Sequence, residues 1–122
     1  MSQFILNDSD REHLTEIRKV CFDISCSAKQ VKRKHIALWE DSLWHELFLC
    51  PLERIGNLAC ALSREFREAT RSEFPWGFVA LLQAIVWVLN HYPNRRIEWE
   101  IASKDLPLLM GFCDRWLETG TQ

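Results

Sequence analysis

The stretch Trp76-Gly-Phe-Val-Ala-Leu-Leu-Gln-Ala-Ile-Val-Trp-Val-Leu89 decides the fold, because its fourteen residues are apolar except at Gln83. As a helix it is about 21 Å long, which is short of the ~20 residues that span a bilayer. Charged residues flank it at Glu73 and Arg95. A helix that is apolar on all sides must be surrounded by other elements. We therefore expect residues 75–91 to form the central helix of a small protein that does not enter a membrane.

Composition places the chain among single-domain proteins with one core. It has 122 residues, of which 48% are hydrophobic and 11% aromatic, enough for one helical domain over residues 1–122. The net charge of −2 gives no overall basic field that would favour nucleic acid. No secretion or lipidation signal is seen, and the five cysteines have irregular spacing, so we expect a cytoplasmic protein with free thiols.

A long helix is predicted between residues 10 and 40. Apolar or small side chains recur there at intervals of three and four, at Leu14, Ile17, Cys21, Ile24, Ala28, Val31, His35 and Leu38. The segment contains no glycine or proline, and Ser9 with Glu12 fits a capping box at its start. We therefore favour one helix, with a weak point at Ser25-Cys26-Ser27.

Further helices follow on both sides of the apolar stretch. Residues 39–49 carry apolar side chains on one side, and Pro51 is expected to end that helix and to begin the next. The next pattern runs from Leu52 to Ala69, and the last helix covers residues 106–118. Together with the central helix, these elements predict a mainly α bundle of four to five helices.

One segment has the period of a strand. Ile97-Glu98-Trp99-Glu100-Ile101 alternates apolar and acidic residues, which is typical of a half-buried strand. A lone strand cannot satisfy its backbone groups, so residues 3–6 are the expected partner of residues 96–101 in a short two-stranded β element.

The sequence offers no pattern of residues that is typical of an active site. It has no glycine-rich phosphate loop, no glycine-flanked serine or cysteine, and no pair of cysteine or histidine residues at zinc-ligand spacing. We therefore expect no catalytic residue, no metal, no cofactor and no enzymatic activity.

Residues Leu52–Phe66 partly resemble a helix-turn-helix motif. They have an alanine in the first helix and Leu-Ser three residues before an aromatic residue, but Cys60 and Ala61 occupy the place of the turn glycine. A continuous amphipathic helix is the favoured interpretation of this stretch. The resemblance is too short to carry a function. A nucleic-acid-binding regulator is nevertheless kept as an alternative function, with Arg64, Arg67 and Arg71, or the basic patch at residues 29–34, as the contact residues.

The leading functional hypothesis is a protein-binding regulator or inhibitor without catalytic activity, in the style of immunity proteins, antitoxins or phage-encoded inhibitors in bacterial or phage defence. It rests on small size, mild acidity and the absence of a catalytic motif, and the contact surface is placed at a basic patch near tryptophans, which are enriched at binding hot spots. The predicted partner-binding residues are Lys29, Lys32, Arg33, Lys34, Trp39 and Trp44.

A third hypothesis is a non-catalytic helical subunit of a larger assembly. The apolar stripe of the first helix then pairs with a second copy or with another chain. The sequence leaves open the partner, the biological process and the choice between monomer and homodimer.

Overall fold

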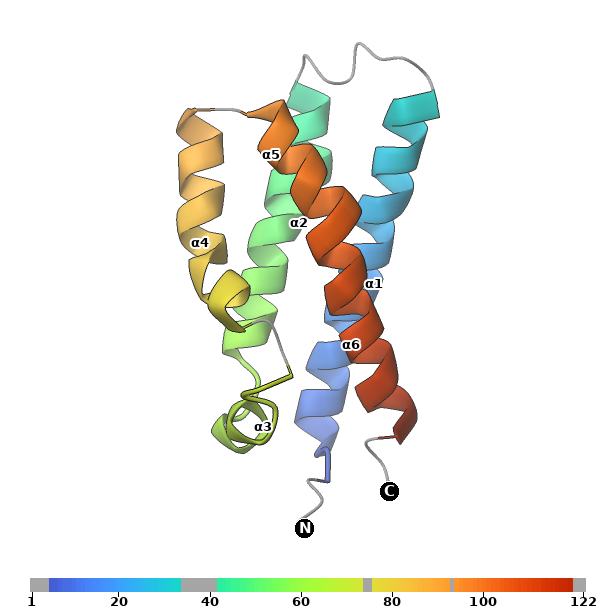
Figure 1. Ribbon diagram of the computed structural model, residues 1–122, viewed down its shortest axis with the longest axis vertical. Coiled ribbons are helices and arrows are strands. Elements are labelled where there is room, and N and C mark those ends of the chain that lie inside the picture. Colours follow the sequence, from blue (N-terminus) through green and yellow to red (C-terminus); the bar gives the residue numbers. More distant parts are fainter. Residues whose placement is uncertain (1–4, 34–41, 74–75, 93, 120–122) are drawn as a thin grey trace.

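The computed structural model describes residues 5–33, 42–73, 76–92 and 94–119, with the side chains of residues 31–33, 42–46, 95 and 119 outside that description. The elements are α1 (Asp8–Arg33), α2 (Ser42–Cys60), α3 (Arg64–Ala69), α4 (Trp76–His91), α5 (Arg95–Glu100), the π-helix η2 (Ile101–Asp105) and α6 (Leu106–Thr119). They form a bundle in which α5, η2 and α6 run on as one long rod (Figure 1). The prediction of a mainly α bundle is confirmed.

Helix α1 is the centre of the packing, because it contacts both α2 and the η2–α6 rod. The predicted apolar stripe is buried there at Leu14, Ile17, Cys21, Ile24 and Ala28, and the helix continues through Ser25-Cys26-Ser27. Val31 belongs to the last turn, whereas His35 and Leu38 lie outside the described residues. The described part of the stripe therefore faces its own bundle and is not free to pair with a second copy.

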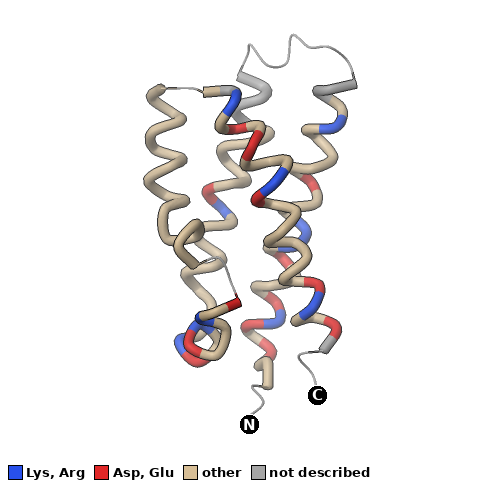
Figure 2. Tube along the Cα trace, in the orientation of Figure 1, with Lys and Arg blue, Asp and Glu red and all other residues tan. Residues whose placement is uncertain are grey.

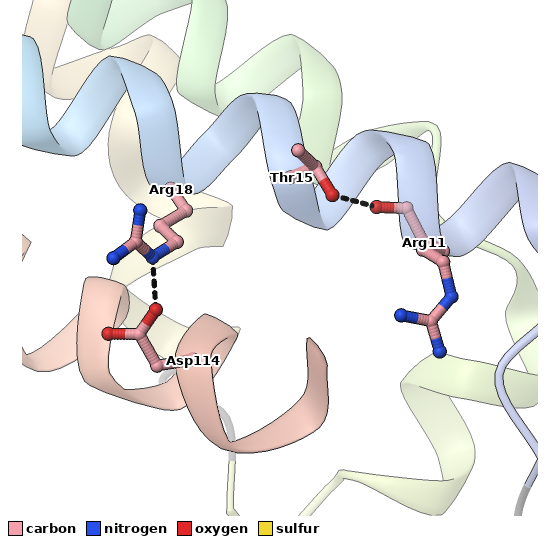
Figure 3. Close-up of polar contacts among 4 residues, drawn as sticks. All are labelled: Arg11, Thr15, Arg18 and Asp114. Carbon is pink, nitrogen blue, oxygen red and sulfur yellow. Dashed lines mark hydrogen bonds and ion pairs between the residues drawn. The ribbon is translucent and has the colours of Figure 1, made fainter. Parts of the chain in front are cut away.

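Polar contacts accompany the packing of α1 on α6. The Arg11 guanidinium donates to the Leu117 carbonyl at 3.2 Å, while the Arg18 guanidinium pairs with the Asp114 carboxylate (Figure 3). Both members of the ion pair are more than one-third exposed, so the pair contributes less than about 1 kcal/mol. Burial of apolar side chains is the larger stabilising term at this contact.

Two cysteines belong to this packed interior. Cys21 and Cys113 are both buried. Burial raises the pKa of the Cys21 thiol to about 12 and shifts the pKa of Cys113 in the same direction. Both thiols are therefore protonated at neutral pH and behave as small apolar side chains.

Helix α4 lies at the edge of the bundle, so its expected central position is wrong (Figure 1). It packs on α2 through its buried side chains, which are Val79, Leu82, Val86 and Leu89. Gly56 of α2 faces α4 at this contact, where an added Cβ would lie in ordinary van der Waals contact, 3.4 Å from the Cβ of Leu82. The opposite side of α4 is exposed although it is apolar, and Trp87 is 60% exposed.

The boundaries of α2 differ from the prediction at both Pro51 and Ala61. The helix continues through Pro51, because Phe48, Leu52 and Ile55 on the same side are fully buried against the neighbouring helices. It ends at Cys60, and the chain turns before Ser63 caps α3. The expected continuous helix from Leu52 to Ala69 is therefore wrong.

The predicted strand at residues 96–101 is a helix. Asn94 caps it, because its side-chain oxygen accepts the Ile97 N–H at 3.1 Å and the Glu98 carboxylate accepts the Asn94 N–H at 3.1 Å. This reciprocal pair begins a helix despite the alternating sequence. No strand occurs among the described residues, and the expected partner, residues 3–6, lies partly outside them. The last helix is confirmed as α6.

Asp10 joins the start of α1 to the turn before α3. Its carboxylate is buried and accepts hydrogen bonds from the Ser63 backbone N–H at 2.7 Å and from the Ser63 hydroxyl at 2.5 Å. Asn7 rather than the predicted Ser9 caps α1, because the Asn7 side chain accepts the Asp10 N–H at 2.7 Å. The capping-box prediction is thus wrong in its residue, and Asp10 instead fixes the α2–α3 turn.

Substitution Asp10→Ala should lower the free energy of unfolding by about 2–3 kcal/mol, because it leaves the Ser63 N–H without its charged acceptor. Asp10→Asn keeps one acceptor and should cost less. Urea unfolding of both variants tests this, with the exposed Asp8→Ala as control. Equal midpoints for Asp10→Ala and Asp8→Ala contradict the role given to Asp10.

The stability of the η2 segment should depend on pH through Asp105. Its pKa is raised, first by burial and then by the neighbouring Glu100 carboxylate, with Lys104 opposing both. A raised pKa means that the folded state disfavours the ionised form of Asp105. The folded state is therefore more stable at acidic pH, where Asp105 is protonated, and this added stability is lost as pH rises through the folded pKa.

Asp105→Asn should therefore raise the melting temperature at pH 7, and the gain should vanish below the ordinary aspartate pKa of about 4. Thermal unfolding from pH 3.5 to 7.5 measures the difference, with Asp23→Asn on the exposed side of α1 as control. A gain that is constant with pH would assign the effect to packing instead.

Candidate protein-docking site

Helix α3 is anchored by one aromatic side chain. Phe66 is fully buried and meets the rings of Phe112 and Trp116 edge to face, at centroid distances of 6.2 and 5.2 Å. Edge-to-face contacts of this kind add about 0.5–1.5 kcal/mol to the burial itself. Because Phe66 points into the bundle, the charged residues of α3 lie on its outer side.

Thr70 connects α3 to the first turn of α4. It is fully buried, and its hydroxyl donates to the Phe66 carbonyl at 2.8 Å. The same hydroxyl accepts the indole N–H of Trp76 at 3.3 Å. A single buried hydroxyl therefore fixes the indole of Trp76 relative to α3.

A pocket of about 340 Å³ opens between the end of α2, α3 and the start of α4. Its floor is apolar and its rim is charged. The lining residues are Ala59, Cys60, Trp76, Val79 and Ala80, with Arg67, Glu68 and Arg71. The pocket lies at the lower limit of the usual size of ligand pockets.

The electrostatics of the rim are weakly basic. Two arginines face one acid, and the Arg71 guanidinium lies 3.9 Å from the Glu68 carboxylate while both side chains stay largely exposed. Such an exposed pair contributes little energy and leaves the arginine free to turn towards a ligand. The arrangement suits an apolar side chain that carries a carboxylate nearby.

The described lining of the pocket contains one carboxylate, that of Glu68, and one thiol, that of Cys60. Cys60 is an exposed free thiol, and none of the lining residues that the structure describes is a histidine. Among the described residues, no three histidine, cysteine, aspartate or glutamate side chains come together as metal ligands would.

Most side chains of the predicted partner-binding patch lie outside the part of the chain that the structure describes. Lys29 is exposed on α1. The backbones of Lys32 and Arg33 belong to the last turn of α1, and that of Trp44 to the first turn of α2, but their side chains are not described. Lys34 and Trp39 also lie outside the described residues. This patch stays a prediction.

The arginines of the alternative site are all exposed, but they do not form a basic surface. Arg64, Arg67 and Arg71 alternate with Glu65 and Glu68 along α3 and the turn after it, and Figure 2 shows the two signs of charge mixed there. With six residues, α3 is shorter than two turns and makes a poor recognition helix. Arg67 and Arg71 line the pocket, whereas Arg64 does not.

The apolar lining residues were missed from the sequence. Ala59 and Val79 belong to buried helical faces, which gave no reason to expect a pocket beside them. The cavity lies where the chain turns between Cys60 and Arg64, and Asp10, which is distant in sequence, accepts a hydrogen bond from Ser63 in that turn.

Comparisons with protein-family models, with curated proteins and with solved structures find no match to this chain. No helix in the described part of the chain combines the length and the apolar character that crossing a membrane requires. The functional inference therefore rests on the geometry of the chain itself.

Proposed function

We propose that this protein is a cytoplasmic, non-catalytic regulator or inhibitor that binds a partner protein in the pocket between α2, α3 and α4. The observation that carries the proposal is an apolar pocket of about 340 Å³ whose rim holds Arg67 and Arg71. Apolar pockets with a charged rim are typical of hot spots, where one anchoring side chain supplies much of the binding energy.

The chemistry of the pocket indicates the kind of partner segment. Its floor of Ala59, Val79 and Ala80 fits one large aliphatic or aromatic side chain. Burying such a side chain contributes about 1.5–3 kcal/mol. The two arginines against the single Glu68 favour a partner that carries an acidic residue next to the anchor.

The basic patch predicted around Lys29 is a separate candidate surface. The C-terminal end of α1 and helix α3 lie at opposite ends of the bundle (Figure 1). One short partner segment therefore cannot reach both. The pocket is favoured because an apolar lining and a charged rim occur together there.

A pull-down from lysate of the native host tests the proposal when it compares matched variants. The pocket variants are Arg67→Glu with Arg71→Glu, which reverses the rim, and Cys60→Trp, which fills the cavity. The control is Arg64→Glu, an exposed α3 position outside the lining. Each sample is divided and treated with or without nuclease.

We expect a stoichiometric protein partner that persists after nuclease treatment. Capture should fall at least tenfold for both pocket variants and should be retained by Arg64→Glu, with melting temperatures unchanged. Equal capture by all variants excludes the pocket as the binding site. Capture that disappears with nuclease favours the nucleic-acid-binding alternative and overturns the proposal.

A further inference from the structure

The outward face of α4 is apolar, exposed and continuous. It lies opposite the side that packs on α2 and consists of Gly77, Ala80, Leu81, Ala84, Trp87, Val88 and His91. The largest members, Leu81, Trp87 and Val88, are 58%, 60% and 46% exposed. No charged residue occurs between Trp76 and His91, so the helix is uniformly tan in Figure 2.

This face has a gradient of side-chain size along the helix. Its N-terminal half presents Gly77 and Ala80, and a Cβ on Gly77 would meet no atom within 4 Å. Its C-terminal half presents the indole of Trp87 stacked on the His91 ring, with centroids 4.2 Å apart and planes at 28°. The C-terminal end of this face therefore presents two stacked aromatic rings, and the N-terminal end presents a shallow surface of small residues.

Ala84 lies midway between these ends. A two-fold axis passing over Ala84 pairs position 77 with 91, position 80 with 88, and position 81 with 87 of an antiparallel second copy. Gly77 and Ala80 then face the larger His91 and Val88, and the two Ala84 residues face each other at the centre. A parallel pair would instead set Trp87 against Trp87 and leave a gap at Gly77.

We propose that two copies of this chain form an antiparallel homodimer through the outward face of α4, with the two-fold axis at Ala84. The contact is isologous, because the same face serves both protomers. The absence of charge on α4 means that no like charges from this helix meet when the face closes on itself.

The available area fits a dimer of modest affinity. The exposed parts of the outward face, with Tyr92 beside it, amount to roughly 500–600 Å² of mostly apolar surface per protomer. Two copies would bury roughly 1,000–1,200 Å² in total, at the lower end of specific protein–protein interfaces. Apolar patches of this size on a monomer mark interaction sites.

Concentration-dependent sedimentation of the full chain tests the dimer. We expect a monomer–dimer equilibrium in the micromolar range for the wild type. Ala84→Glu sets two carboxylates against each other on the axis and should raise the dissociation constant at least 100-fold. The matched control is Leu108→Glu, because Leu108 is 72% exposed on α6 and outside the face.

Cysteine cross-linking tests the direction of pairing in a background where the exposed Cys50 and Cys60 are changed to serine. Ala84→Cys should form a disulfide dimer under mild oxidation, because two residues facing each other across helices ~8 Å apart lie within disulfide range. Gly77→Cys alone should not, since antiparallel copies place these positions about 21 Å apart along the helix. An equimolar mixture of Gly77→Cys and His91→Cys should cross-link.

Several results would overturn the dimer. These are a chain that stays monomeric up to millimolar concentration, an Ala84→Glu variant that dimerises like the wild type, or a disulfide formed by Gly77→Cys alone. Of the described pocket lining, Ala80 also belongs to the outward face of α4, whereas Arg67 and Arg71 of the rim do not. Reversal of Arg67 and Arg71 should leave the dissociation constant of the dimer unchanged, so the two proposals can fail separately.

Discussion

The position of α3 depends on the buried carboxylate of Asp10. Both of its oxygens accept hydrogen bonds from Ser63, and the Ser63 hydroxyl in turn accepts the Phe66 N–H at 3.1 Å. This chain of contacts stops α2 from continuing and turns Phe66 into the bundle. Thr70 then holds the indole of Trp76 at the start of α4. The pocket is therefore a consequence of one buried acid at the start of the first helix.

Helix α4 has two apolar faces, and the two faces lie in different environments. The inner face, with Leu82 and Val86, is buried against α2, where Gly56 lies next to Leu82. Gln83 supplies a polar contact at the border, where its side-chain amide donates to Asn57 at 3.2 Å. The outer face meets no other element in the described chain and stays exposed. A continuous apolar patch on the surface of a domain is the usual sign of an interaction site.

The buried stripe of α1 and the extent of α6 could be predicted, because a 3.6-residue period over several turns reports directly which side is buried. Local sequence patterns predicted the wrong secondary structure where tertiary contacts or helix caps compete with them. Pro51 lies inside α2 because the buried residues around it favour continuation. Residues 97–101 alternate as a strand does, but the contacts between Asn94 and Glu98 begin a helix there.

The apolar stretch from Trp76 to Leu89 explains why the candidate site was harder to predict than the fold. Its composition shows that both sides of the helix are apolar, and hydropathy alone does not say whether the chain itself covers the second side. A chain of this size has few helices, so it can surround only one of them with the others. Here α1 takes the central position, because it contacts α2 on one side and η2 and α6 on another. With α1 in the centre, α4 lies at the edge of the bundle, and its second apolar face stays exposed.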